Sequence, residues 1–338
     1  MKIFSFPHVV LYELMKQFEP VELIGLSYCS KSAHAVVKTF SKVEEDLKIC
    51  SVENFGYSIE FPTKMLIGVF SEENMTLLKQ DPETHYRFKR WAEGFKHLHI
   101  CQDVIQGFRE TTNYVCDLLN VPVSTVDIYC DSDLWMLDFV EQRQEQPLKN
   151  VYAYISDTAG AYSRVMSCNA TQDLECGFAS PRNYRFDGKL PTSKKLNLTD
   201  GSWISRKQFL GLESQYVQLC NTELRRSDIR ALLRSWLNGG FPNLKHLTII
   251  GVKIDEEIYD GIRDRLERVQ EKVTYKGLAP RRHSLKNRFL FRDFLHTDVE
   301  LGTNAFHIRR EDYIVATVKV FAGLFIMVVW PDTNGNHV

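Results

Sequence analysis

Residues 214–249 read SQYVQLCNTELRRSDIRALLRSWLNGGFPNLKHLTI and contain one complete alternation of strand, helix and strand. Val217 and Leu219 are apolar at alternate positions, as in a half-buried strand, and Leu247 and Ile249 repeat this pattern. Between them, residues 227–237 carry apolar side chains at three- and four-residue steps, and a Gly-Gly pair ends the helical pattern. Two strands joined by one helix over so short a stretch pair in parallel with a right-handed crossover. The stretch therefore predicts a strand–helix–strand unit.

The same spacing of apolar residues, L-x-x-L-x-L, recurs along the chain. Its starts lie at residues 95, 123, 148, 193, 214 and 244. The steps between starts are close to the length of a leucine-rich repeat, about 20 to 29 residues, except for the long step after 148. That step contains residues 158–191, rich in Gly, Ser, Asn and Pro, which we interpret as a loop inserted in one repeat. Helices are expected over residues 104–120, 132–144, 205–210, 227–237 and 255–269.

The predicted fold class is α/β, with a group of N-terminal helices followed by an irregular leucine-rich-repeat-like α/β solenoid. Its curved parallel sheet would be lined outside by the helices. A strict leucine-rich repeat has Asn three residues after the last apolar strand position, where it bonds the turn backbone. Two of the equivalent positions here are Gly201 and Val252, whose side chains cannot make that hydrogen bond. We therefore expect an array of irregular curvature.

The first forty residues have a different pattern, that of short amphipathic helices. Pro7 suits a helix start, and Val10 and Leu14 follow on one face. Pro20 interrupts this pattern and fits the first turn of a second helix, and the periodicity continues over residues 33–40. Two or three short helices bury too little surface to be stable alone. We expect their apolar face to contact something else.

Several of these residues resemble a known motif. Phe6-Pro7, Val10, Leu14 and then Glu22-Leu23-Ile24-x-Leu26-Ser27-x-Cys29-Ser30-Lys31 are similar to the F-box, whose usual form is Leu-Pro, a helix, Asp-Leu, and Leu-Ser-x-Val-Cys-Lys or Arg. The departures are Phe6 for Leu, Val9 where Glu is common, and Glu22 for Asp. The resemblance implies contacts with the Skp-type adaptor of a cullin ubiquitin ligase through Pro7, Val10, Leu14, Leu23, Leu26 and Lys31. The alternative is that these apolar residues pack only within the chain.

Late segments carry a second resemblance. The runs are Leu224-Arg225-Arg226-Ser227-Asp228-Ile229, Leu233-x-x-Trp236-x-x-Gly239-Gly240, Leu244-Lys245-His246-Leu247, Ile308-Arg309-Arg310-Glu311-Asp312, Ala316-Thr317-Val318 and Val329-Trp330-Pro331. Together they resemble the type 2 F-box-associated domain that is expanded in nematodes, closely in the last third of the chain and loosely in the middle. The expected organisation is an F-box at 1–45, a connecting segment at 46–92, the repeat-like F-box-associated domain at 93–330 and a tail at 331–338.

Side chains between the apolar strand positions would point to the concave face of the sheet, because strand side chains alternate. Tyrosines mixed with small polar residues favour a protein-binding surface, since tyrosine gives a large contact area at low entropic cost. We predict that a target protein contacts His99, Asp127, Tyr129, Tyr152, Tyr154 and Tyr216. The alternative is that these residues cover the sheet or pack beneath segment 158–191.

The sequence has no P-loop, H-E-x-x-H, G-x-S-x-G or G-x-G-x-x-G motif, so we expect no catalytic residues and no cofactor. His97, His99 and Cys101 share one strand face, but alternate strand residues lie about 6.6 Å apart and converge poorly on a metal ion. We expect no metal. A lesser alternative is that a basic run binds nucleic acid or directs nuclear import. The run consists of Arg281, Arg282, Lys286, Arg288 and Arg292.

Composition indicates which kinds of partner and which cellular compartments to expect. The 338 residues include 42 basic and 43 acidic side chains, and a net charge of -1 gives no overall field to attract a polyanion or an anionic membrane. Eight cysteines without a C-x-x-C pair or a secretory signal favour a reducing compartment, cytoplasmic or nuclear or both. The apolar run at 320–330 is shorter than the roughly 20 residues that cross a bilayer, so we expect buried strands there.

These expectations combine into a substrate-recognition subunit of a Skp–cullin–F-box ubiquitin ligase, with no catalytic residues of its own. It would bind an unidentified target protein on the concave face of its repeats. The alternative is an interaction or scaffold protein with no ligase role.

Overall fold

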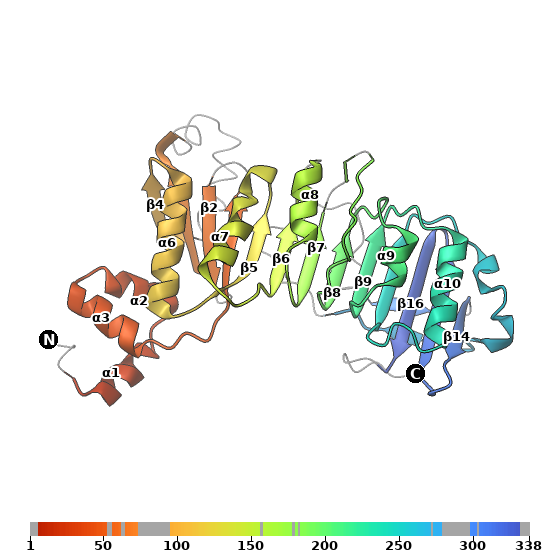
Figure 1. The fold of residues 1–338 in the computed structure, drawn as a ribbon. Coiled ribbons are helices and arrows are strands. Elements are labelled where there is room, and N and C mark those ends of the chain that lie inside the picture. Colours follow the sequence, from red (N-terminus) through yellow and green to blue (C-terminus); the bar gives the residue numbers. More distant parts are fainter. Residues whose placement is uncertain are drawn as a thin grey trace, which may run out of the picture. The chain divides into compact units, whose positions relative to one another are not determined.

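The computed structural model has a mixed α/β architecture (Figure 1). It describes residues 6–52, 56–61, 65–73, 95–155, 158–177, 180–181, 183–271, 273–278, 298–302 and 304–331. The chain divides into two compact units: unit 1, Met1–Val151, and unit 2, Tyr152–Val338. The division lies within strand β6 (Asn150–Ala153) and therefore inside the predicted repeat array 93–330.

Unit 1 begins with three short helices, here called the N-terminal helices: α1 His8–Met15, α2 Pro20–Ser27 and α3 Lys31–Phe40. Pro20 occupies the first turn of α2, where its missing amide hydrogen is not needed, and the Glu22 carboxylate accepts a hydrogen bond from the Glu19 amide at 2.8 Å. The Ser30 hydroxyl accepts from the Ala33 amide at 3.1 Å and caps α3. The side chains that the three helices bury are Leu11, Met15, Val21, Leu23, Ile24, Ala33 and Val37.

The sheet of unit 1 has the strand order β5-β1-β2-β3-β4. Its central strand β2 (Gly56–Phe61) pairs antiparallel with both β1 (Leu47–Val52) and β3 (Met65–Ser71). On the outer sides, β5 (Val123–Ile128) pairs in parallel with β1, and β4 (Phe95–Cys101) pairs in parallel with β3. The segment predicted to connect the two domains, 46–92, contains the three strands β1, β2 and β3. They belong to a meander and lack the repeat spacing, so a search for repeats could not find them.

Two helices, α6 (Val104–Leu119) and α7 (Trp135–Arg143), lie on one face of this sheet (Figure 1). The Asp103 carboxylate accepts from the Gln106 amide at 3.0 Å and caps α6, which ends at Asn120 in the left-handed region with φ 54°. Between the helices and the sheet, the ring of Phe108 lies 4.9 Å from Tyr57 and 6.0 Å from Trp135, measured between ring centres. This aromatic cluster joins both helices to β2.

In unit 2 four neighbouring strands are parallel: β7 (Asp173–Cys176), β8 (Lys195–Leu198), β9 (Tyr216–Cys220) and β10 (His246–Ile250). Helix α9 (Arg206–Leu210) lies between β8 and β9 in sequence, and α10 (Arg226–Leu237) between β9 and β10. Leu196 is paired with Val217, and Val217 with Leu247, the positions that the apolar spacing makes equivalent. All three side chains are fully buried.

Segment 158–191 is not one inserted loop, and that prediction is wrong. It contains α8 (Ala159–Met166) and β7. The Thr158 hydroxyl accepts from the Ala161 amide and caps α8, and the buried Tyr162 hydroxyl donates to the Asp200 carbonyl at 3.1 Å. A strand of four residues shows too few apolar positions to reveal its period, and the Gly and Ser residues around it are typical of loops.

After β10 the pairing becomes antiparallel. β16 (Leu324–Trp330) pairs with β10, followed outward by β15 (Val315–Phe321), β14 (Ala305–Arg309) and β11 (Leu266–Arg268). β12 (Val273–Tyr275) and β13 (Val299–Leu301) form a separate two-stranded sheet. The prediction of buried strands at 320–330 is confirmed for β16, whose residues 325–330 are buried, but not for the end of β15, where Phe321 is 63% exposed. In the described part of the chain, no helix is long and apolar enough to span a bilayer.

The helix predicted over 255–269 is wrong. The chain forms the 3-10 turns η3 (Glu256–Tyr259) and η4 (Arg263–Arg265) and then enters β11. Gly261 has φ +79°, a conformation that glycine adopts without strain and that interrupts a right-handed helix. The apolar spacing of this stretch therefore arises from turns that bury Ile258 and Tyr259.

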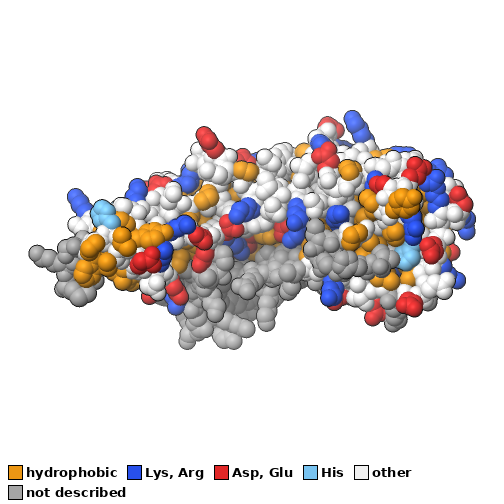
Figure 2. Space-filling view, turned by 90° about the horizontal axis from the view of Figure 1, so that it is seen from below, with side chains coloured by type: hydrophobic (Ala, Val, Ile, Leu, Met, Phe, Trp, Pro, Cys, Tyr) orange, Lys and Arg blue, Asp and Glu red, His pale blue; other side chains and the backbone are white. Residues whose placement is uncertain are grey.

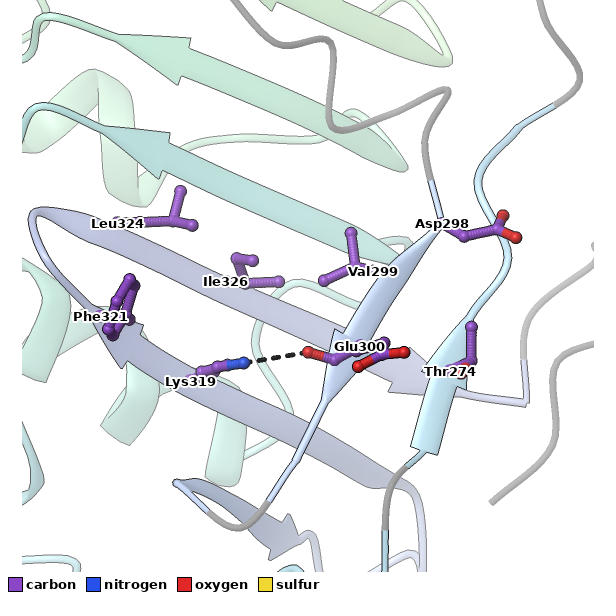
Figure 3. Close-up of a pocket in the computed structure, with 8 residues that line it drawn as sticks. All are labelled: Thr274, Asp298, Val299, Glu300, Lys319, Phe321, Leu324 and Ile326. Atoms are coloured by element: carbon purple, nitrogen blue, oxygen red, sulfur yellow. Dashed lines mark hydrogen bonds between the residues drawn. The ribbon is translucent and has the colours of Figure 1, made fainter.

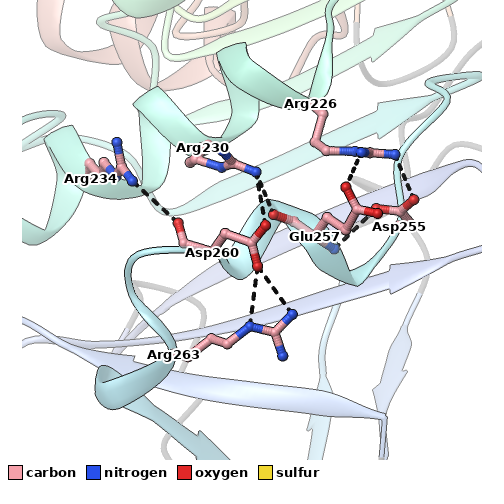
Figure 4. Close-up of polar contacts among 7 residues, drawn as sticks. All are labelled: Arg226, Arg230, Arg234, Asp255, Glu257, Asp260 and Arg263. Atoms are coloured by element: carbon pink, nitrogen blue, oxygen red, sulfur yellow. Dashed lines mark hydrogen bonds and ion pairs between the residues drawn. The ribbon is translucent and has the colours of Figure 1, made fainter.

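Arginines of α10 bind this turn segment (Figure 4). Arg226 pairs with Asp255 at 2.6 Å and also with Glu257. Arg230 donates to the Glu257 carbonyl at 2.8 Å and lies 3.3 Å from the Asp260 carboxylate. Arg226, Arg230 and a third arginine, Arg234, are four residues apart, so they lie on one face of α10.

Candidate protein-interaction sites

The N-terminal helices expose apolar side chains around the start of α1. Val9 is 75% and Val10 45% exposed, and Phe6 and Pro7 are also exposed. Figure 2 shows apolar side chains gathered over this end of unit 1. Lys31, at the start of α3, is exposed as well. These residues are accessible to a partner protein.

The other predicted adaptor contacts are less accessible. Leu14 and Leu26 are half-buried, and Leu23 is only 2% exposed. Adaptor binding by the six residues stays a prediction. Leu23 contributes to the stability of these helices in any case, so a charged side chain at that position would disrupt them.

Helix α6 packs against the N-terminal helices, and its Tyr114 makes polar and aromatic contacts with them. Its hydroxyl lies 2.6 Å from the Ser27 hydroxyl and 3.3 Å from Nδ1 of His34. Its ring stacks on Tyr28 with centres 5.1 Å apart and planes 8° apart. This contact could not be predicted from the sequence, because Tyr114 lies within the amphipathic pattern of α6. The contact fixes α2 and α3 on the sheet domain of unit 1.

His99 lies on the opposite face of the sheet from the one predicted. Its Nδ1 is 3.1 Å from the Thr111 hydroxyl of α6, and burial lowers its pKa. Leu98 and Ile100, expected in the core, are 46% and 53% exposed instead. The L-x-x-L-x-L spacing therefore assigned β4 to the wrong face, since a shift of one residue exchanges the two faces of a strand.

Asp127 is 1% exposed and belongs to a buried charge network in unit 1. Its carboxylate lies 2.5 Å from Nζ of Lys48, which is also 3.4 Å from the Glu60 carboxylate. The Ser58 hydroxyl donates to Glu60 at 3.0 Å. Burial alone would lower the pKa of Lys48, but the facing carboxylates raise it above its ordinary value, so Lys48 stays charged. Asp127 neutralises an internal charge, a role the sequence did not indicate.

Tyr152 and Tyr154 of unit 2 use their hydroxyls within the chain. Tyr152 donates to Asp173 at 3.1 Å, and Tyr154 donates to Glu175 at 3.1 Å. Lys195 lies 3.2 Å from Asp173 and offsets its charge. Both tyrosines are buried, so little of either ring is accessible. In unit 1, Tyr129 is half-buried, and its backbone amide donates to the Ser51 hydroxyl at 2.8 Å.

Tyr216 is fully buried and packs against Leu278. Next to it on the sheet, His246 meets Tyr275 edge-on, with ring centres 4.9 Å apart, and Tyr275 also meets Trp330 at 6.0 Å. The C-terminal part of the chain thus covers the sheet face at β9, β10 and β16. The alternative stated from the sequence, that these residues are covered by the chain itself, holds for Tyr216, although the covering residues lie after β10 and not in segment 158–191.

A cavity of about 560 Å³ lies in unit 2 between the two-stranded β12–β13 sheet and the β15–β16 hairpin of the large sheet (Figure 3). We call it the hairpin groove. Strands β12 and β13 and the residue before β13 supply one side, and the β15–β16 hairpin supplies the other. Its lining residues are Thr274, Asp298, Val299, Glu300, Lys319, Phe321, Leu324 and Ile326. The sequence patterns did not indicate this site, because its two sides are distant in sequence.

The remaining predicted features give no further site. The basic run Arg281–Arg292 lies outside the described residues. Among those that are described, no three His, Cys, Asp or Glu side chains are grouped so as to hold a metal ion. All eight cysteines are free thiols, and burial raises the pKa of Cys116 to about 11.

Comparisons with known proteins give two findings on family. No solved structure matches the chain. The chain is 22% identical over 287 residues to the Skn-1 dependent zygotic transcript 15 protein of Caenorhabditis elegans, an alignment covering 76% of this chain and 81% of that protein. Residues 186–249, which include β8, α9, β9, α10 and nearly all of β10, match the family model described as F-box associated. Unit 2 therefore carries an F-box-associated domain.

Proposed function

We propose that this chain is the substrate-recognition subunit of a Skp–cullin–F-box type ubiquitin ligase. The F-box-associated domain at 186–249 is the observation that carries the proposal. The N-terminal helices add support, since Val9 and Val10 expose apolar surface beside residues that resemble an F-box. Such exposed apolar clusters are typical of protein-binding sites.

In this proposal the N-terminal helices bind a Skp-type adaptor, and unit 2, an irregular leucine-rich-repeat-like array, binds the target protein. The chain supplies no catalytic residue, metal or cofactor. It raises the effective concentration of the target near the ubiquitin-conjugating enzyme. The contact of Tyr114 with Ser27 and His34 supports this role, because it holds the N-terminal helices on the sheet of unit 1. We place the protein in the cytoplasm, the nucleus or both.

The test is co-purification of the full chain with a Skp-type adaptor. The variant Val10→Asp with Lys31→Glu changes two exposed residues and should leave the fold intact. We expect adaptor binding to fall at least about tenfold, since a charge is placed in an apolar contact and a basic one is reversed. Lys38→Glu, on exposed α3 surface outside the F-box resemblance, is the matched control and should bind normally.

Equal adaptor binding by the double variant and the control would refute adaptor contact through these residues. A chain that binds no adaptor at all but still captures a target would indicate an interaction protein without a ligase role. Circular dichroism and the urea midpoint of unfolding, measured for each variant, check that its fold is unchanged.

A further inference from the structure

The hairpin groove has an apolar floor. Val299 and Ile326 are 7% and 2% exposed, and Leu324 is half-buried beside them. Phe321, at the end of β15, is 63% exposed although its ring lines the groove. A large aromatic side chain that stays exposed beside an apolar floor can gain contact area from a ligand.

The rim of the groove is polar, with charges at defined positions (Figure 3). Asp298 is exposed, and one oxygen of its carboxylate accepts from the Gly277 amide at 3.0 Å. This hydrogen bond fixes the orientation of the exposed carboxylate at the rim. Lys319 lies at the opposite side and donates to the backbone carbonyl of Glu300 at 3.0 Å. A positively charged ligand group is therefore favoured at Asp298, away from Lys319.

The backbone of β13 favours an extended ligand. β13 pairs with β12 along one edge, and in the described part of the chain no other strand pairs with it. The Glu300 carbonyl bonds the Lys319 side chain across the groove, so it is directed toward the cavity. A peptide strand added beside β13 would take the place of the Lys319 ammonium at the Glu300 carbonyl, while the apolar floor accepts alternate side chains of the peptide.

From these three features we propose that the hairpin groove binds an extended peptide segment of a partner protein. One large apolar side chain of the peptide lies against Phe321, Leu324 and Ile326, and a lysine or arginine two residues away contacts Asp298. The size of the cavity is within the range of ligand pockets, roughly 300–1,000 Å³. The inference rests on the proposed function only in identifying the partner as the target protein. It also moves the expected target site away from Tyr216, which the chain itself covers.

The probe is a pair of pools of fluorescein-labelled heptapeptides with a central Leu or Phe. One pool carries Lys or Arg two positions from the centre, and the other carries Glu there. Fluorescence anisotropy with the full chain measures each affinity. We expect the basic pool to bind about three- to tenfold more tightly, Phe321→Ser to weaken its binding about tenfold, and Asp298→Asn to remove the preference for the basic pool.

Matched controls are Tyr313→Asn, which removes an aromatic ring that is 82% exposed outside the groove, and Glu311→Gln, which removes an exposed carboxylate. Both should bind like the natural chain. The proposal is overturned if neither pool binds, if the acidic pool binds more tightly, or if the groove variants bind like the controls. Adaptor co-purification is measured separately, so failure of the groove and failure of the ligase assignment give different results.

Discussion

Unit 2 contains two segments, 173–250 and 251–331, whose strands pair in different ways. In the first segment each strand pairs in parallel with the next one in sequence, from β7 to β10, and the paired positions Leu196, Val217 and Leu247 are fully buried. In the second segment the pairing is antiparallel and only partly sequential: β14, β15 and β16 pair in order, but β10 pairs with β16 and β11 pairs with β14 across longer stretches of sequence. We call these the sequential segment and the return segment. Local periodicity specifies the first, whereas the second depends on which surfaces remain uncovered once the first has formed.

The return segment covers a face of the sequential one. Tyr275 packs on His246 and Trp330, and Leu278 packs on Tyr216. These contacts convert a face that resembles an open binding surface into interior. A repeat pattern in a sequence therefore does not establish that its concave face is accessible.

The largest effect is expected from Trp236→Ala in the sequential segment. Trp236 is fully buried on α10, and its removal should lower the free energy of unfolding by about 3–5 kcal/mol through lost burial and a cavity. Urea unfolding followed by far-ultraviolet circular dichroism measures the change. Exposed Tyr313→Asn is the control and should change the free energy by less than about 0.5 kcal/mol. A loss below about 1 kcal/mol in Trp236→Ala would contradict the central place of α10 in this core.

Much of the fold could be predicted where apolar spacing is regular. The ranges of β5, β9, β10, α6 and α10 lie within two or three residues of the predicted ones. Two helix predictions show the limit: 227–237 forms α10, but 255–269 does not form a helix, although both have apolar residues at helical steps. Gly261 adopts φ +79° and interrupts the helical pattern, but a glycine in the sequence does not show this by itself, since α6 contains Gly107 and is helical.

The candidate sites were less predictable than the fold. Val10 and Lys31 are exposed as a partner contact requires, yet Leu23, from the same motif, is buried. His99 faces α6, Asp127 pairs with Lys48, and Tyr216 lies under Leu278. Each of these outcomes depends on a residue at least 12 positions away in sequence, and spacing within one strand carries no information about such a partner.

A second prediction tests the contacts by which Tyr275 of the return segment covers the sheet. Tyr275→Leu keeps most of the apolar volume but loses two edge-on ring contacts, so we expect a loss of about 1–2 kcal/mol in the free energy of unfolding. Hydrogen exchange of the backbone amides of β10 and β16 should become faster, while that of β7 should not change. If amide hydrogen exchange instead became faster throughout unit 2, the contacts of Tyr275 would not be separable from the stability of the sequential segment.

A third prediction concerns the turn at Gly261, near the start of the return segment. Gly261→Ala forces a side chain into the left-handed region and brings its Cβ toward the Arg234 guanidinium, which can move aside. The expected loss is about 1 kcal/mol in the free energy of unfolding, measured by thermal melting with urea unfolding as a check. Gly261→Asn should lose less, because Asn tolerates this conformation better than Ala. An equal loss in the two variants would mean that crowding at Arg234, and not backbone conformation, sets the cost.

The smallest effect is expected from the arginines of α10. Arg226 and its partners Asp255 and Glu257 are all substantially exposed, with side-chain exposures of 39%, 53% and 58%. Water screens such pairs, so Arg226→Ala should lower the free energy of unfolding by less than about 1 kcal/mol at low salt. The difference from the natural chain should shrink in 1 M NaCl, where the screening length is about 3 Å. Arg230→Ala should keep more of its effect in salt, because Arg230 also donates to the Glu257 backbone carbonyl, and a neutral hydrogen-bond acceptor is screened less than a carboxylate. If both variants lost their effect equally in salt, the return segment would be held on α10 by charge alone; a remainder specific to Arg230 would show that the backbone of η3 is recognised as well.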